Sequence, residues 1–198
     1  MAVKLIVYKT NEGVMMKFEK VSHDQFVKDC INLFGYGRMD LIEESYKSIE
    51  LPKRKTMFSA GYDFIYPFND TTLKAGESII FPTGIKAQLD HNTFLMLVPR
   101  SGLGFKFRLQ LDNTIGIIDA DYYNNDNNEG HIMAKMTNDG KEGKSVTLKR
   151  GQGFMQGIIL PYLIADEEAV DTVRSGGFGS TDKVWNFFEK AVDKGEIK

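Results

Sequence analysis

SIIFPTGIKAQLDHNTFLMLVP, residues 78–99, alternates short apolar runs with the turn-forming groups Pro-Thr-Gly and Asp-His-Asn. Such groups end strands, because glycine, proline and asparagine favour the backbone conformations of turns. Similar apolar runs follow at residues 131–138 (HIMAKMTN), 145–150 (SVTLKR) and 154–165 (FMQGIILPYLIA). Many short strands with this punctuation predict a mainly β protein, a sandwich, jelly roll or barrel, rather than a parallel sheet.

The composition is typical of a soluble globular protein, since 42% of the 198 residues are hydrophobic and 26% are charged. A net charge of -2 gives no broad basic surface, so we expect no direct nucleic-acid or membrane partner. The single cysteine, Cys30, excludes an internal disulfide and fits a reducing compartment. The N-terminal stretch MAVKLIVYKTNEG turns polar too soon for a signal peptide, so we expect a cytoplasmic protein.

The N-terminal segment has a different pattern from the β region. Two apolar runs at residues 4–8 and 14–18 flank Asn-Glu-Gly and predict a hairpin. Ser22 stands three residues before Gln25 as a capping box, which predicts the start of a helix. The apolar stripe expected on that helix is Val27, Cys30, Ile31 and Phe34. A second, weaker helix is expected over residues 39–49.

These patterns divide the chain into four expected parts. Residues 1–50 form an N-terminal extension of hairpin and helices, and residues 51–172 form the β domain. Residues 173–182, VRSGGFGSTD, are rich in glycine. A stripe of apolar residues after them predicts a C-terminal helix over residues 183–198.

Five segments are hard to explain as strands and turns alone. PRSGLG at residues 99–104 can turn an arginine and backbone N–H groups onto a phosphate, although a plain turn is the alternative. In NTIGIIDADY, residues 113–122, apolar residues lead to Asp119, so its carboxylate is expected at the end of a buried strand. A carboxylate there is costly unless it is hydrogen-bonded or functional, with a turn aspartate as the alternative.

Two other segments have equally plain alternatives. In GQGFMQG, residues 151–157, Gln156 falls within an apolar strand and is either functional or a satisfied core amide. The glycine-rich residues 173–182 are either a flexible linker or a functional loop. The fifth segment is SAGYD, residues 59–63, where small residues precede an acid.

Together, and in this order, these segments resemble the five motifs of the trimeric dUTPase family. The matching stretches are AGYDF (60–64), PRSGLG (99–104), NTIGIIDADY (113–122), GQGFMQGI (151–158) and GGFGST (176–181). The resemblance implies a dUTPase-like distorted jelly-roll β-barrel that forms a homotrimer with active sites shared between subunits. It also implies Mg²⁺-assisted hydrolysis of dUTP to dUMP and pyrophosphate, which limits uracil in DNA and supplies dUMP for dTMP synthesis.

The resemblance implies roles for residues of the third motif. Asp119 would be the general base that activates water for in-line attack on the α-phosphorus. Tyr122 would pack beneath the deoxyribose and leave no volume for a 2'-hydroxyl. A hairpin over residues 113–119 would present backbone groups to the uracil edge, through Asn113, Gly116 and Ile118.

Other residues are implied in phosphate binding. Those that match the family's phosphate-holding positions are Arg100, Ser101, Gly102 and Gln156. Mg²⁺ would be held mainly by phosphate oxygens and water, with Asp63 either in contact with the metal's waters or purely structural. The fifth motif would close over the substrate, with Phe178 stacked on uracil and the terminal phosphates reached by Arg174, Gly179, Ser180 and Thr181.

The chain departs from the family pattern at two places beside the expected site. Val173 stands where the family usually has arginine, and Arg174 comes one residue later. A polar insertion, residues 123–129, follows Tyr122 where the family usually continues Arg-Gly.

Two other functions fit parts of this pattern. A dCTP deaminase shares the fold, but its catalytic glutamate would be expected where this chain has Lys135. A nucleotide-sensing regulatory protein could keep the pocket, although binding alone does not need the base Asp119.

Overall fold

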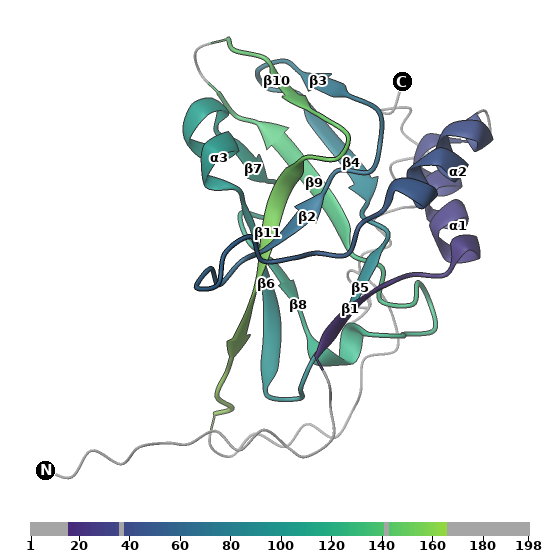
Figure 1. The fold of residues 1–198 in the computed structure, drawn as a ribbon. Helices are drawn as coiled ribbons and strands as arrows, with labels where there is room; N and C mark the ends of the chain where they lie inside the picture. Colours follow the sequence, from purple (N-terminus) through teal and green to yellow (C-terminus); the bar gives the residue numbers. More distant parts are fainter. Residues whose placement is uncertain (1–15, 36–37, 141–142, 166–198) are drawn as a thin grey trace, which may run out of the picture.

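The computed structural model describes residues 16–35, 38–140 and 143–165 of the chain (Figure 1). Within these ranges the elements are β1 (Lys17–Lys20), α1 (His23–Phe34), α2 (Met39–Ser48), β2 (Tyr62–Ile65), β3 (Thr71–Leu73), β4 (Ser78–Pro82), β5 (Ile85–Gln88), β6 (Thr93–Pro99), α3 (Ser101–Phe107), β7 (Leu109–Leu111), β8 (Gly116–Ile118), η2 (Ala120–Tyr122), β9 (Met133–Asn138), β10 (Val146–Leu148) and β11 (Gly153–Pro161). The expected mainly β fold is confirmed. The fifth motif and the expected C-terminal helix lie outside the described residues.

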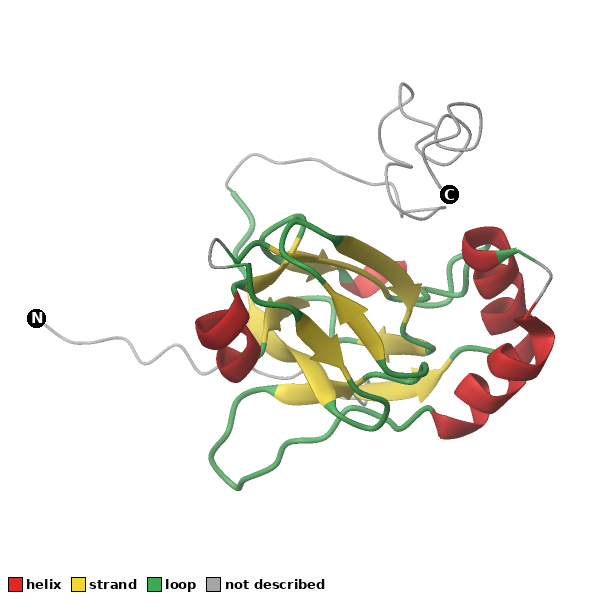
Figure 2. Cartoon of the chain, turned by 90° about the horizontal axis from the view of Figure 1, so that it is seen from above, coloured by secondary structure: helices red, strands yellow, loops and turns green. Residues whose placement is uncertain are grey.

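The strands form two larger sheets and two strand pairs, and every pairing between described strands is antiparallel. One sheet has the order β2-β11-β6-β8 and the other the order β4-β9-β7. The pairs are β1 with β5 and β10 with β3. Figure 2 shows α1 and α2 on one side of the strands and α3 on the opposite side.

The apolar run at residues 78–89 is divided between two sheets at Gly84. Its first part, β4, pairs with β9, and its second part, β5, pairs with β1. Gly84 has a φ of +75°, and a Cβ there would lie 2.2 Å from Cδ1 of Ile49. Glycine is required here because the chain must turn in a left-handed conformation against a buried side chain.

The described part of the N-terminal extension packs on the β domain. β1 adds to β5 from Lys17↔Gln88 to Lys20↔Ile85, whereas the first arm of the expected hairpin lies outside the described residues. The N-cap half of the capping box is confirmed, because the Ser22 hydroxyl oxygen accepts a hydrogen bond from the Gln25 backbone N–H at 3.1 Å. The reciprocal half is absent, because the Ser22 N–H donates to Glu129 and the Gln25 side chain donates to Asp29.

The buried face of α1 differs from the predicted stripe. Its buried residues are Gln25, Phe26, Asp29 and Cys30, whereas Phe34 is 43% exposed. Val27 and Ile31 are only partly buried against the core. The predicted stripe was right for Cys30, partly right for Val27 and Ile31, and wrong for Phe34. It missed Gln25 and Asp29, because apolar periodicity cannot detect polar side chains on a buried face.

Aromatic rings join α1 to the sheets. Phe26 has no exposed surface, and its ring lies 6.1 Å from that of Phe68. The Phe81 ring lies 4.9 Å from that of Tyr66 and 5.0 Å from that of Phe154. Burial raises the pKa of the neighbouring Cys30 thiol to about 12, so this cysteine stays protonated and serves as core.

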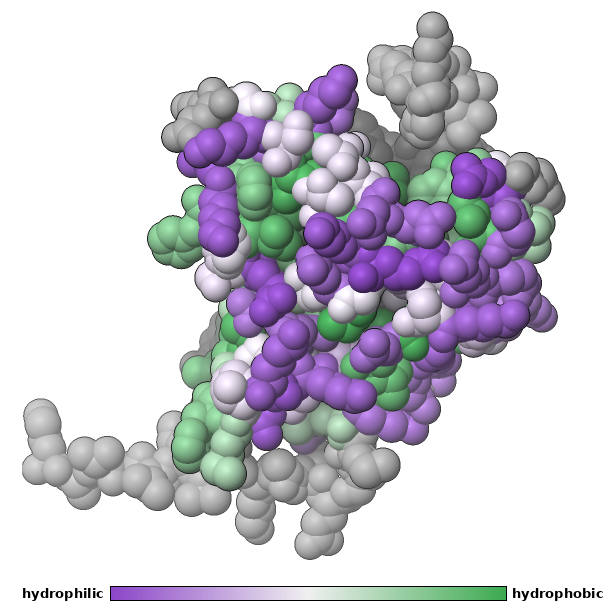
Figure 3. All heavy atoms as spheres, turned by 45° about the horizontal axis from the view of Figure 1, so that its top comes forward, coloured by the Kyte–Doolittle hydropathy of each residue, from purple (hydrophilic) through white to green (hydrophobic). Residues whose placement is uncertain are grey.

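No helix within the described ranges combines the length and the apolar composition that a bilayer crossing requires. Figure 3 shows a face that is largely hydrophilic, with apolar residues gathered in separate patches.

Candidate active site

Three neighbouring strands bring the first, second and fourth motifs together. On β2, Asp63 is the register partner of Gln156 on β11. On the other side of β11, Met155 pairs with Pro99, the last residue of β6, and Arg100 follows directly. The sheet therefore gathers an acid, an amide and a guanidinium from three segments that are distant in the sequence.

Asp63 lies between two cations. Its Oδ1 is 3.3 Å from Nε of Arg100, and its Oδ2 is 3.6 Å from Nζ of Lys55. Asp63 itself is 8% exposed, and burying a carboxylate is costly unless it has such partners. Because both carboxylate oxygens face cations, the geometry favours a structural role that orients Arg100.

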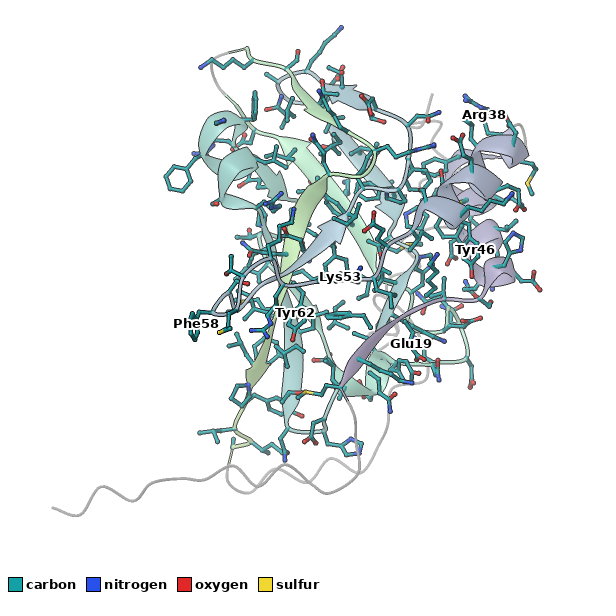
Figure 4. The ribbon with its side chains drawn as sticks, viewed as in Figure 1. Glu19, Arg38, Tyr46, Lys53, Phe58 and Tyr62 are labelled. Carbon is teal, nitrogen blue, oxygen red and sulfur yellow. The ribbon has the colours of Figure 1, made fainter. Side chains whose placement is uncertain are left out.

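Lys55 is a site residue that the sequence analysis missed. It belongs to the run Lys-Arg-Lys at residues 53–55, directly ahead of the first motif, and this run is the signal that could have revealed it. Its side chain is 61% exposed. Further along the same loop, Phe58 is 94% exposed and projects away from the strands (Figure 4).

Two glycines allow the cluster to pack closely. A Cβ on Gly61 would lie 2.1 Å from Oε1 of Gln156, so the amide lies directly against the backbone of the first motif. A Cβ on Gly153 would lie 2.8 Å from Nη1 of Arg100. That same Nη1 donates a hydrogen bond to the Gly153 carbonyl oxygen at 3.3 Å. The guanidinium is therefore fixed by the first and fourth motifs at once.

The second motif forms a short helix and not the plain turn that was the alternative. Arg100 precedes α3, and Ser101 and Gly102 are its first two residues, both exposed. Backbone N–H groups in a first helical turn have no carbonyl partner inside the helix. Ser101 can thus offer a hydroxyl and an N–H group beside the guanidinium, which suits an anionic ligand.

The third motif does not form the predicted hairpin. β7 pairs with β9 in one sheet and β8 pairs with β6 in the other, so residues 112–115 form a turn between sheets. Within this exposed turn, which includes Asn113, Thr114 has a φ of +66° and its N–H donates to the Leu111 carbonyl oxygen at 2.8 Å. The hairpin implied by the family resemblance is therefore not formed, because each flank of the turn pairs with a different strand.

Asp119 directly follows β8, as predicted. It is half-buried and comes just before η2. Within β8, Gly116 is buried against Leu97, whose Cβ would lie 3.0 Å from an added Cβ. Ile118 is buried, whereas Ile117 points outward and is 51% exposed.

Tyr122, at the end of η2, is 3% exposed. Its hydroxyl donates to the His131 carbonyl oxygen at 3.0 Å and accepts a hydrogen bond from Nδ2 of Asn128 at 2.8 Å. Asn128 belongs to the polar insertion, and no motif in the sequence indicated its contact with Tyr122.

The two halves of the site lie at opposite ends of β6 within one chain (Figure 1). Ile118 pairs with Leu95 near the start of β6, whereas Arg100 follows its end. At about 3.3 Å per strand residue, Asp119 and Arg100 of one chain lie roughly 20 Å apart. The structure therefore joins Asp63, Arg100 and Gln156 but keeps Asp119 and Tyr122 separate from them.

The remaining predicted residues, Arg174, Phe178, Gly179, Ser180 and Thr181, lie outside the described residues. In the part of the chain that the structure describes, no three His, Cys, Asp or Glu side chains are placed to hold a metal ion.

Fold and site together define a class of protein. It is an antiparallel β protein in which a cluster of cations and an amide suits phosphate groups, while a carboxylate stands at a distant strand end. The comparisons with known proteins agree with this class.

A family profile described as dUTPase matches residues 47–182. The deoxyuridine 5'-triphosphate nucleotidohydrolase of Lactococcus lactis is 42% identical over 135 residues, which cover 67% of this chain and 88% of that protein. The crystal structure of dUTPase from Streptococcus mutans is 36% identical and covers 76% of this chain and 98% of that one, with a TM-score of 0.53.

A dUTPase from phage phi11 of S. aureus, whose structure reports the coordination of a structural Mg(II) ion, covers 64% of this chain and 92% of that one. Its TM-score is 0.51 and its identity 19%, which shows the shared fold alone. The chain belongs to the dUTPase family. The family predicted from the five motifs is thus confirmed.

Proposed function

We propose that this protein hydrolyses dUTP to dUMP and pyrophosphate. The observation that carries the proposal is the family relationship, with 42% identity to a named deoxyuridine 5'-triphosphate nucleotidohydrolase. The cluster of Arg100 with Gln156 supports it, because a guanidinium and an amide suit a triphosphate chain. Asp119, which follows β8 directly, supports it too, because its position matches the family's base.

The proposed reaction is an in-line displacement by water. Asp119 accepts a proton as the water oxygen bonds to the α-phosphorus, and the bond from that phosphorus to the bridging oxygen breaks. The leaving pyrophosphate consists of the β- and γ-phosphates. The residues that would hold it are Arg100, Ser101, Gly102 and Gln156. The closing loop at residues 173–182 would exclude other water, with Phe178 on the uracil ring.

Substrate selection would come from the third motif. Backbone groups of Asn113, Gly116 and Ile118 would pair with the uracil edge. Cytosine would be rejected because its different edge would leave these buried groups unpaired. Tyr122 would exclude ribonucleotides by occupying the space that a 2'-hydroxyl needs.

Mg²⁺ is compatible with the residues present. It prefers phosphate oxygens and water to a cage of side chains, and Asp63 is already engaged by Arg100 and Lys55. When bound with the triphosphate, the ion would neutralise charge as pyrophosphate leaves. Asp63 would then act through Arg100.

In a homotrimer with shared sites, the two halves of the site could come together from different subunits. A second copy could bring its Asp119 to the Arg100 cluster of the first, which one chain does not do. Exposed apolar side chains near Asp119 support such a contact, since Ile115 is 43% and Ile117 51% exposed. A cytoplasmic location, without a nucleic-acid or membrane partner, stays a prediction.

A nucleotide panel tests this function directly. With Mg²⁺ present, pyrophosphate should be released from dUTP and not from dCTP, dTTP or UTP, and chelation of Mg²⁺ should abolish the release. Ammonia release from dCTP would instead indicate a deaminase, which is not favoured because this chain has Lys135 where a deaminase would be expected to carry its catalytic glutamate. Tight binding of dUTP without hydrolysis would indicate a sensor.

Gly153→Ala should weaken substrate binding without unfolding the protein. The new methyl group would meet Nη1 of Arg100 at 2.8 Å and push the guanidinium out of place. Losing one charge-assisted contact of this kind should raise KM for dUTP about tenfold. Gly104→Ala in α3 is the matched control, because the nearest atom to its added Cβ is 4.0 Å away. Equal KM values for the two variants would show that Gly153 does not serve to place Arg100.

A further inference from the structure

The polar insertion after Tyr122 forms an ordered loop built on two asparagines. Nδ2 of Asn125 donates to the Tyr122 carbonyl oxygen at 2.8 Å and to Oδ1 of Asn128 at 2.9 Å. Oδ1 of Asn125 accepts hydrogen bonds from the backbone N–H groups of Asn127 and Asn128, both at 3.1 Å. The loop thus holds the backbone of Tyr122 through one asparagine.

Asn128 holds the other end of the same tyrosine. Its Nδ2 donates to the Tyr122 hydroxyl at 2.8 Å and to the His131 carbonyl oxygen at 3.3 Å. Its Oδ1 accepts from the Gly130 N–H at 3.1 Å. Gly130 has a φ of +79°, and a Cβ there would lie 2.6 Å from the Tyr122 carbonyl oxygen, so the loop closes tightly around the tyrosine.

His131 is itself fixed by α1, which lies outside the residues matched by the family profile. Its Nε2 accepts a hydrogen bond from the Gly84 N–H at 2.8 Å, so Nδ1 carries the hydrogen and lies 2.6 Å from Oδ2 of Asp29. The same Asp29 oxygen accepts from Nε2 of Gln25 at 2.8 Å. His131 has no exposed surface, and the three buried side chains satisfy one another.

Glu129 makes a second connection between the insertion and α1. It accepts hydrogen bonds from the Ser22 N–H at 2.9 Å and from the Ser22 hydroxyl at 2.5 Å. Lys86 Nζ lies 3.3 Å from the same carboxylate and donates to Oδ1 of Asn124 at 2.7 Å. The insertion is therefore anchored to the start of the helix as well as to its buried face.

We propose that Asn128 is a positioning residue for Tyr122, and that α1 supports it through His131 and Glu129. The inference rests on the proposed function, in which Tyr122 excludes the 2'-hydroxyl of ribonucleotides. The Tyr122 ring can exclude a 2'-hydroxyl only if it keeps its position, because a shift of the order of 1 Å changes which substrates a site accepts. The hydrogen bond from Asn128 to the phenolic oxygen supplies this stiffness, and the ring discriminates between sugars only while it is held.

Asn128→Asp tests the proposal, because aspartate keeps the size and the Oδ1 acceptor but cannot donate to the tyrosine hydroxyl. The measurement is kcat/KM for dUTP and for UTP, with thermal melting to check the fold. The dUTP preference should fall about three- to tenfold, the usual worth of one hydrogen bond. Tyr122→Phe should lower the preference similarly, and the double variant should lower it no further than either single change.

Asn127→Asp is the matched control, since it adds the same charge one residue away and Asn127 joins the loop through its backbone. It should keep the wild-type preference. An unchanged preference in a folded Asn128→Asp variant would overturn the inference while leaving dUTP hydrolysis intact. If that variant does not fold, an unchanged preference in Tyr122→Phe would overturn it. A wild-type protein that fails to cleave dUTP would instead refute the proposed function, and the inference with it.

Discussion

Asp119→Asn is expected to lower kcat for dUTP hydrolysis by about 10²- to 10⁴-fold, the usual contribution of a general base. Asparagine has nearly the same shape, and it can still hydrogen-bond to water. It cannot accept the proton that water must lose as its oxygen bonds to phosphorus. The Kd for a non-hydrolysable dUTP analogue should stay close to the wild-type value, because the phosphate-binding cluster lies elsewhere in the fold.

The measurement is pyrophosphate release under saturating dUTP, together with calorimetric titration of the analogue. Asp126→Asn, which makes the same chemical change at an exposed position of the insertion, should leave both values unchanged. If Asp119→Asn hydrolyses dUTP at the original rate, the proposed mechanism is wrong. If it loses analogue binding as well, Asp119 has a structural role.

Mixed oligomers of two inactive variants are expected to recover activity. In one chain Asp119 and Arg100 lie roughly 20 Å apart, from a rise of about 3.3 Å per residue along β6. Under the proposed shared site, an active site combines Asp119 of one subunit with Arg100 of its neighbour. When Asp119→Asn and Arg100→Ala chains are mixed equally and assemble at random, about a quarter of such sites receive both native residues.

The experiment co-expresses the two variants with different tags, purifies the mixed oligomer and measures pyrophosphate release. The control mixes Asp119→Asn with the double variant Asp119→Asn/Arg100→Ala, in which no chain carries the base, so no recovery is expected. Mixed oligomers that show no more activity than the separate variants would refute the shared site. A monomer in solution, with full wild-type activity, would also refute it.

The strand pattern and the motif positions followed from local sequence. β4, β5, β6, β9 and β10 lie within the predicted apolar runs and β11 begins one residue before its run, because alternating apolar residues and turn residues act over a few neighbours. The start of α1 at Ser22 was predictable for the same reason, since the cap bonds to a residue three positions away. Asp119 at the end of β8 also followed from the apolar run before it.

Interactions between segments that are distant in the sequence were harder to predict from it. The expected hairpin of the third motif is divided between two sheets, since strand pairing depends on partners far along the chain. The buried face of α1 was misjudged because Asp29 finds its partner, His131, 102 residues later. Lys55 had only the basic run at residues 53–55 as a signal and Asn128 had none, and their contacts with Asp63 and Tyr122 reveal them.

By itself, the sequence determined the family and the β class, and it supplied the residues that are proposed to carry the chemistry, because motifs and strand periodicity are local properties. Only the tertiary structure decided that Asp63, Arg100 and Gln156 meet on three adjacent strands while Asp119 stands at the far end of β6. It also decided that the insertion after Tyr122 hydrogen-bonds to both ends of that tyrosine and to the start of α1. The physical reason is that register and long-range hydrogen bonds depend on which segments pack together, and no short stretch of chain specifies that choice.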